Sequence, residues 1–71
     1  IMTLQELLDK YLTKEEQKEK TYIYAFNENL TSLENDGNLV NAKKLDIQLN
    51  HLTTLKGIEL MSNLEQITIY G

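Results

Sequence analysis

A fixed offset of 22 residues relates the apolar side chains of this chain. It places Leu45 with Ile67 and Ile47 with Ile69. In a chain of only 71 residues, such an offset favours a stack of structural repeats in which each unit contacts its neighbours. The alternative is an ordinary small α/β domain with accidental periodicity. We favour the repeat because the matching positions are those that a core must fill, whereas the surface positions vary.

The best-formed unit covers residues 42–52 and reads Ala-Lys-Lys-Leu-Asp-Ile-Gln-Leu-Asn-His-Leu. It resembles the leucine-rich-repeat signature L-x-x-L-x-L-x-x-N-x-L, with Ala42 in the first leucine slot. Leu45 and Ile47 alternate along a short strand and are predicted to point inward. Asn50 follows at the turn, where its side chain can bond backbone groups that would otherwise be buried and unpaired.

The segment that returns from this turn extends the resemblance. The Gly-Ile pair at 57–58 and the Asn-Leu pair at 63–64 are similar to pairs in the 22-residue repeats of bacterial internalin-type proteins. The resemblance is good over residues 42–71 and loose over 21–41. It implies a right-handed solenoid coil with a strand-lined concave face that binds another protein, at a secreted or cell-surface location. It implies no catalytic residue and no cofactor. The leucines and isoleucine of the return segment are expected to pack on the same core: Leu52, Leu55, Ile58 and Leu60.

Ahead of the repeats, residues 3–12 have the apolar spacing of an amphipathic helix. Thr3 and Glu6 form a capping-box start for it. Thr13 and Glu16 form a second one, which predicts another short helix. Because residues 13–21 contain no large apolar side chain, that second segment is expected to lie in water.

We interpret this front segment as a cap, because the terminal core of a repeat stack must be sealed. A partner-binding helix is the alternative. The expected organisation is a helical cap over residues 1–20 and leucine-rich repeats over 21–71, of which one is degenerate, one full and one truncated. The degenerate unit has Lys20 in the first leucine slot and Glu28 in the asparagine slot.

Composition excludes several classes of function. A net charge of −4 and the absence of arginine argue against nucleic-acid binding. No apolar run approaches the roughly 18 residues of a membrane span. There is no cysteine, the single histidine (His51) has no partner for a zinc site or a triad, and residues 32–43 fail as a calcium loop. We therefore predict that the chain is not an enzyme and holds no metal.

The repeat register predicts where a partner would bind. Side chains between the inward strand positions point outward and form three columns. Four of the five aromatic residues fall in these columns, a composition favoured at recognition hot spots. The alternative is that aromatic residues simply favour strands. The nine predicted partner-binding residues are Tyr22, Lys44 and Gln66; Tyr24, Asp46 and Thr68; and Phe26, Gln48 and Tyr70.

These observations predict a protein–protein interaction module that presents this face to another, unidentified protein. The alternative is a purely structural cap that nucleates and seals a longer array whose ligand site lies further along. The strand-like segment Ile67–Tyr70 would leave an open apolar sheet edge. We expect further repeats to follow it, with self-association through that edge as the alternative.

Overall fold

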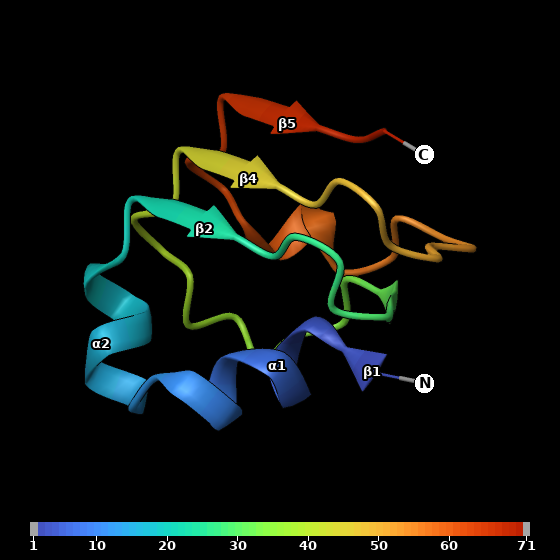
Figure 1. Ribbon diagram of the computed structural model, residues 1–71. Helices are drawn as coiled ribbons and strands as arrows, with labels where there is room; N and C mark the ends of the chain where they lie inside the picture. Colours follow the sequence, from blue (N-terminus) through green and yellow to red (C-terminus); the bar gives the residue numbers. More distant parts are fainter. Residues whose placement is uncertain (1, 71) are drawn as a thin grey trace.

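The computed structural model describes residues 2–70 and has an α/β architecture. In chain order the elements are β1 (Met2–Thr3), α1 (Leu4–Tyr11), α2 (Lys14–Glu19), β2 (Tyr22–Tyr24), β3 (Leu30–Ser32), β4 (Lys44–Asp46), the 3-10 helix η1 (Ile58–Leu60) and β5 (Gln66–Thr68). Figure 1 shows β2, β4 and β5 one above another, with α1 and α2 on the β2 side of the stack. The predicted α/β class with short parallel strands is confirmed.

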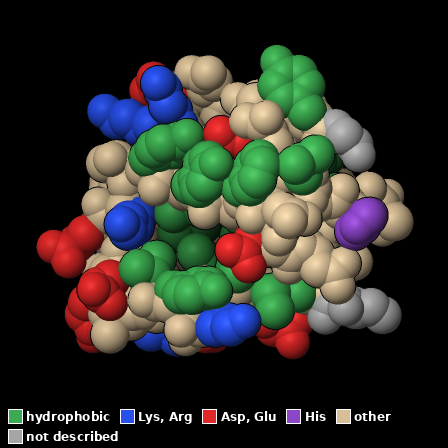
Figure 2. Space-filling view, in the orientation of Figure 1, with side chains coloured by type: hydrophobic (Ala, Val, Ile, Leu, Met, Phe, Trp, Pro, Cys, Tyr) green, Lys and Arg blue, Asp and Glu red, His purple; other side chains and the backbone are tan. Residues whose placement is uncertain are grey.

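The 22-residue offset is the register of the main sheet. Its strand order is β2-β4-β5, and both pairs are parallel. Ile23 pairs with Leu45, and Leu45 pairs with Ile67. Ile23 and Leu45 are buried and Ile67 is half-buried, so this column points into the core as predicted. The neighbouring side chains point the other way, where Figure 2 shows a row of hydrophobic groups along β2.

Side-chain hydrogen bonds outside the strands repeat at the same offset. Asn41 Nδ2 donates to the carbonyl oxygen of Lys18 at 2.7 Å, and Asn63 Nδ2 donates to that of Val40 at 2.6 Å. Each asparagine lies shortly before a strand, and its side chain bonds a residue 23 positions earlier in the chain. Both acceptors are backbone atoms, so the contact does not depend on the side chain at the acceptor position.

A second, two-stranded sheet ties the N-terminal end of the chain to the first return segment. β1 pairs in parallel with β3, with Met2 opposite Leu30 and Thr3 opposite Ser32. The Thr31 hydroxyl also donates to the Met2 carbonyl oxygen at 3.3 Å. Sequence reasoning did not foresee this pairing, because two residues before a helix are too few to show a strand pattern.

The core lies between the main sheet, α1 and the return segments. Its buried hydrophobic residues are Leu4, Leu7, Leu8, Ile23, Ala25, Leu30, Leu33, Leu39, Ala42, Leu45, Ile47 and Met61. The expectation that Leu55 and Leu60 pack into it is wrong, because both are exposed. Side chains three apart in a 3-10 helix share one face. Ile58 and Met61 are therefore the pair that turns inward, and Leu60 turns outward.

Gly57 lets this return segment lie directly on the one before it. Its φ of 108° lies in the left-handed region, and a Cβ there would collide with the Leu33 carbonyl group. Asn35 Nδ2 joins the two segments by donating to the carbonyl oxygens of Leu33 at 2.9 Å and Gly57 at 3.1 Å. The contact therefore needs glycine at this position.

Both predicted capping boxes are present. The Thr3 hydroxyl accepts the Glu6 backbone N–H at 3.1 Å, and the Glu6 carboxylate accepts the Thr3 backbone N–H at 2.9 Å. Thr13 and Glu16 repeat the arrangement at the start of α2. The bond from the Thr3 backbone lowers the pKa of Glu6 below its ordinary value. These local signals fix where both helices begin.

The expectation that residues 13–21 lie entirely in water is wrong for Gln17, which is 0% exposed. Its Nε2 donates to Asp9 Oδ1 at 2.9 Å and to the Leu12 carbonyl oxygen at 3.3 Å. Its Oε1 accepts from Gln5 Nε2 at 3.1 Å. A buried amide needs such partners, and α1 and its C-cap residue Leu12 supply them. Gln17 therefore fixes α2 against α1.

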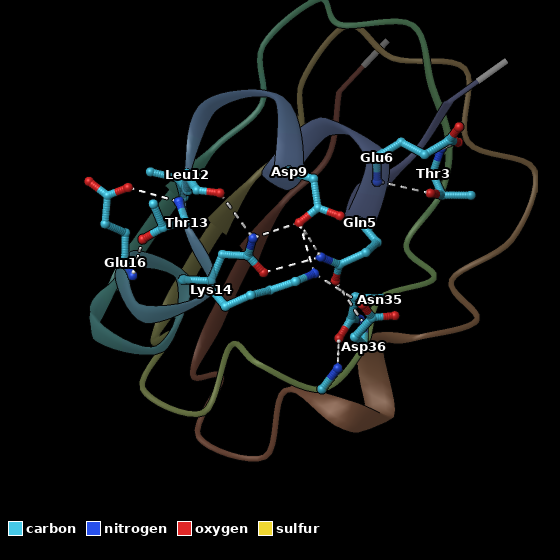
Figure 3. Close-up of polar contacts among 12 residues, drawn as sticks. Thr3, Gln5, Glu6, Asp9, Leu12, Thr13, Lys14, Glu16, Asn35 and Asp36 are labelled. Atoms are coloured by element: carbon cyan, nitrogen blue, oxygen red, sulfur yellow. Dashed lines mark hydrogen bonds and ion pairs between the residues drawn. The ribbon is translucent and has the colours of Figure 1, made fainter.

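This polar network continues to the loop after β3 (Figure 3). Lys14 Nζ lies 3.0 Å from Asp9 Oδ1 and 3.3 Å from Asp36 Oδ2. Gln5 Oε1 accepts the Asp36 backbone N–H at 2.8 Å. Hydrogen bonds from Gln17 and then Lys14 hold the pKa of the Asp9 carboxyl below its ordinary value. Two helices and a loop are thus joined around one carboxylate.

Candidate protein-interaction face

The nine predicted residues lie on the outward side of the main sheet and the segments that continue its strands. We call this set the strand face. Its four aromatic side chains are between 40% and 66% exposed. Lys44 and Gln66 are also exposed, whereas Asp46, Gln48 and Thr68 are half-buried. Six of the nine side chains are thus open to solvent and three are partly covered, and the role of all nine in binding stays a prediction.

Three aromatic rings form a continuous row along β2 and the residues after it (Figure 2). The Tyr22 and Tyr24 rings meet edge to face, with centroids 6.2 Å apart. The Tyr24 and Phe26 rings are stacked, with centroids 5.9 Å apart and planes within 4° of parallel. Strand geometry puts alternate side chains on one face, and ring contacts of this kind add stability beyond area burial. The three rings therefore support one another in this row without a partner.

A carboxylate lies beside this row and is held by its neighbours. Tyr22 Oη donates to Asp46 Oδ2 at 3.3 Å. Gln48 Nε2 donates to both carboxylate oxygens of Asp46, at 2.9 and 3.1 Å. Loss of solvent around the phenol raises the pKa of Tyr22, and the Asp46 charge raises it further. The Tyr22 hydroxyl therefore remains a neutral hydrogen-bond donor at physiological pH.

A depression of about 770 Å³ extends along β4 and β5, from the residues before these strands to Gln48 and Thr68. Six of the nine predicted residues line it; Tyr24, Phe26 and Tyr70 do not. Its complete lining is Thr21, Tyr22, Lys43, Lys44, Leu45, Asp46, Gln48, Glu65, Gln66 and Thr68. Lysine and carboxylate groups alternate with neutral donors and acceptors, a composition suited to the polar part of a protein contact.

One aromatic residue of the helices also lies near the strand face. Tyr11, in the last turn of α1, lines a second and smaller hollow together with Tyr22 and Tyr24. The sequence separates Tyr11 from these residues and offers no signal for the contact. It depends on how α1 packs against β2, which is a tertiary property.

The part of the chain that the structure describes contains no cluster of side chains typical of a metal site. Among residues 2–70 no three His, Cys, Asp or Glu side chains gather as they would around a metal ion. Between Met2 and Tyr70 no helix is long and apolar enough to cross a bilayer. His51 is exposed, and its backbone N–H donates to the Leu30 carbonyl oxygen at 3.0 Å. No protein-family model matches the chain, and no curated protein or solved structure matches it.

Proposed function

We propose that this chain is a protein-interaction module of the leucine-rich-repeat type, in which the strand face binds another protein. One observation carries the proposal: exposed aromatic side chains form an ordered row on that face, at positions set by the 22-residue register. Exposed aromatic area with nearby polar groups is typical of recognition hot spots. The proposed function is binding, with no catalytic role and no cofactor.

Asn50 supports the leucine-rich-repeat reading. Its Oδ1 accepts the backbone N–H groups of Glu28 at 2.9 Å and Leu30 at 3.0 Å. Its Nδ2 donates to the carbonyl oxygens of Ala25 at 2.6 Å and Ile47 at 3.0 Å. In the leucine-rich-repeat signature the asparagine follows the strand, where its side chain can pair buried backbone groups of its own repeat and of the preceding one. The side chain at this slot makes those bonds here.

We extend this proposal to the organisation of the protein. Residues 1–20 would be the helical cap and residues 21–71 the first repeats of a right-handed solenoid. The order of cap and repeats, and the strand-lined concave face, would then be similar to those of internalin-like proteins. A secreted or cell-surface location follows from the family resemblance alone. In support, α1 and α2 lie at the β2 end of the stacked strands (Figure 1), where a cap would cover the first turn.

A second candidate function is a structural one, in which this segment nucleates and seals a longer array. The far end of the strand stack favours it. Within β5 Ile67 is only half-buried, and just after this strand Ile69 is exposed. The matching residues one repeat earlier, Leu45 and Ile47, are both buried. A further repeat would cover these groups and pair the free edge of β5. Self-association through Ile67–Tyr70 would cover them as well.

The double variant Tyr24→Ala/Tyr70→Ala separates the two functions. A partner retrieved by cross-linking to the wild-type chain would be purified and its affinity for each variant measured by calorimetry. Binding through the strand face predicts a loss of about 30-fold or more, because truncating each of two interface side chains costs roughly 1–2 kcal/mol. Leu55→Ala, an exposed truncation outside the nine residues, serves as the control. Unchanged affinity in a folded double variant would refute the binding face and favour the structural role.

A further inference from the structure

A separate groove of about 220 Å³ lies between α1 and β2. Figure 2 shows it as an apolar hollow directly below the row of aromatic side chains. Its floor consists of Leu7 and Leu8 from α1 and Ile23 from β2, which also belong to the core. We call it the cap groove. A concave apolar floor at the rim of an exposed face is the usual setting for an anchoring side chain.

The walls of the cap groove are aromatic. Tyr11 stands on the α1 side and is 62% exposed, and Tyr22 and Tyr24 stand on the β2 side. Sites for small-molecule ligands usually measure about 300–1,000 Å³. The cap groove is smaller than that range, so its size suits one large apolar side chain. Tyrosine walls offer such a side chain both apolar contact and a polar tip.

The charge of the cap groove differs from that of the whole chain. Among the described residues that line it, Lys20 is the only charged one, although the chain has a net charge of −4. Both ion pairs found within residues 2–70 belong to Lys14, so Lys20 is in neither. The Glu16 carboxylate, one turn away, accepts the Thr13 backbone N–H, and this bond and the Thr13 hydroxyl, with a smaller contribution from the Lys20 charge, lower the pKa of Glu16. Figure 2 shows a basic group at one end of the hollow and an acidic group at the other.

A second ammonium group lies close by. Lys10 Nζ is 5.6 Å from the centroid of the Tyr11 ring, within the range of a cation–π contact. A partner carboxylate placed beside Tyr11 or beside Lys20 would therefore meet opposite charge. A partner that brings a lysine or arginine there would meet repulsion.

We propose that the cap groove receives a large apolar side chain from an acidic segment of the partner protein, with an adjacent carboxylate of that segment beside Lys20. This inference rests on the proposed protein-binding function and adds to it the chemistry of the bound segment. It extends the recognition surface from the strands onto α1, so that the helical segment takes part in binding as well as covering the core.

The proposal is tested by nuclear magnetic resonance with two probe peptides. The ¹⁵N-labelled 71-residue chain is titrated separately with N-acetyl-Leu-Glu-amide and with N-acetyl-Leu-Lys-amide. The expected result is shift changes centred on the backbone amides of Leu8, Tyr11 and Tyr24, with affinity for the glutamate probe about two- to fivefold higher than for the lysine probe. That ratio corresponds to one solvent-exposed ion pair, and it should decrease as salt is added.

Three variants make the result specific. Tyr11→Ala should weaken both probes, because it removes one wall of the groove. Lys20→Glu should reverse the preference between the probes, whereas Lys18→Glu, a matched charge reversal on α2 outside the groove lining, should preserve it. The same spectra show whether each variant is folded. Shift changes away from α1 and β2, equal affinity for the two probes, or the same effect from Lys18→Glu as from Lys20→Glu would overturn the proposal.

This experiment and the test of the strand face can fail independently. The probes and Tyr11→Ala report on the cap groove alone, and loss of partner binding in Tyr70→Ala reports on the strand face alone, because Tyr70 does not line the groove. A partner whose affinity depends on Tyr70 but not on Tyr11 or Lys20 would leave the proposed function in place and refute the inference about the groove.

Discussion

Replacing Asn50 by alanine should cause a large loss of stability. Asn50 is 8% exposed, and its Oδ1 accepts the backbone N–H groups of Glu28 and Leu30. Each buried donor left unpaired costs about 1–3 kcal/mol. We therefore expect Asn50→Ala to lower the free energy of unfolding by about 2–5 kcal/mol. A chain of this length is expected to have a total of only about 4–10 kcal/mol, so the variant should be close to its unfolding threshold.

Urea unfolding followed by circular dichroism measures this loss. Asn63→Ala is the matched control, because Asn63 is exposed and makes a single hydrogen bond, to the Val40 carbonyl oxygen. That bond should contribute about 0.5–1.5 kcal/mol. Asn50→Leu is a second variant, because leucine keeps a similar volume and can bond nothing. A similar loss in Asn50→Leu and Asn50→Ala assigns the effect to hydrogen bonding rather than to a cavity.

The comparison is sharp because the two asparagines differ in burial and in number of bonds, not in residue type. If Asn50→Ala costs no more than Asn63→Ala, with an unchanged dependence on urea, the buried backbone groups do not need the Asn50 side chain. The hydrogen bonds of Asn50 would then add nothing to stability, and Asn50 would no longer support a leucine-rich-repeat fold.

Two further perturbations follow from single contacts. Gly57→Ala should prevent stable folding, because the added Cβ meets the Leu33 carbonyl group. The control Gly37→Ala has open space around the new Cβ and should cost about 1 kcal/mol of stability, from its positive φ alone. Equal thermal unfolding midpoints for the two variants would contradict this expectation. Asp9→Asn should be less stable than wild type at pH 7 in urea unfolding. The Asp9 pKa is lowered in the folded state, chiefly by Gln17, so its stabilising contribution is present above the ordinary value of 3.8 and is lost as the pH falls through the folded pKa. The difference from wild type should therefore shrink at the acid end, and a gap that stays constant down to that end would contradict the assignment.

Several structural features could be predicted from the sequence because they depend on local or periodic signals. The capping boxes depend on residues three apart, which the chain itself holds together. The strand register follows from the 22-residue offset, because equivalent side chains must fill equivalent places in the core. The outward positions of the strand face follow from the same register. Even the unit with Lys20 and Glu28 in irregular slots forms β2 in register with β4.

Other features depend on packing that no local pattern records. Gln17 lies in a segment without large apolar residues, and only the approach of α2 to Asp9 on α1 explains its burial. The choice of Met61 over Leu60 for the core depends on the short 3-10 helix before it. The cap groove depends on the position of Tyr11 against β2. In each case the residue is visible in the sequence, but its burial or its neighbours depend on tertiary contacts.

The paired bonds of Asn41 and Asn63 have a consequence for how such a chain can change in length. Both side chains reach a backbone carbonyl oxygen one turn back, and the strand register advances by the same step. Duplicating residues 44–65 in tandem would keep the 22-residue step, so the copied Asn63 could again reach a backbone carbonyl oxygen one turn back, whereas inserting a few residues between Asp46 and Asn63 would change the spacing of that bond and the β4–β5 register. A change in length by 22 residues is therefore expected to preserve these contacts, whereas a shorter insertion is expected to disrupt them.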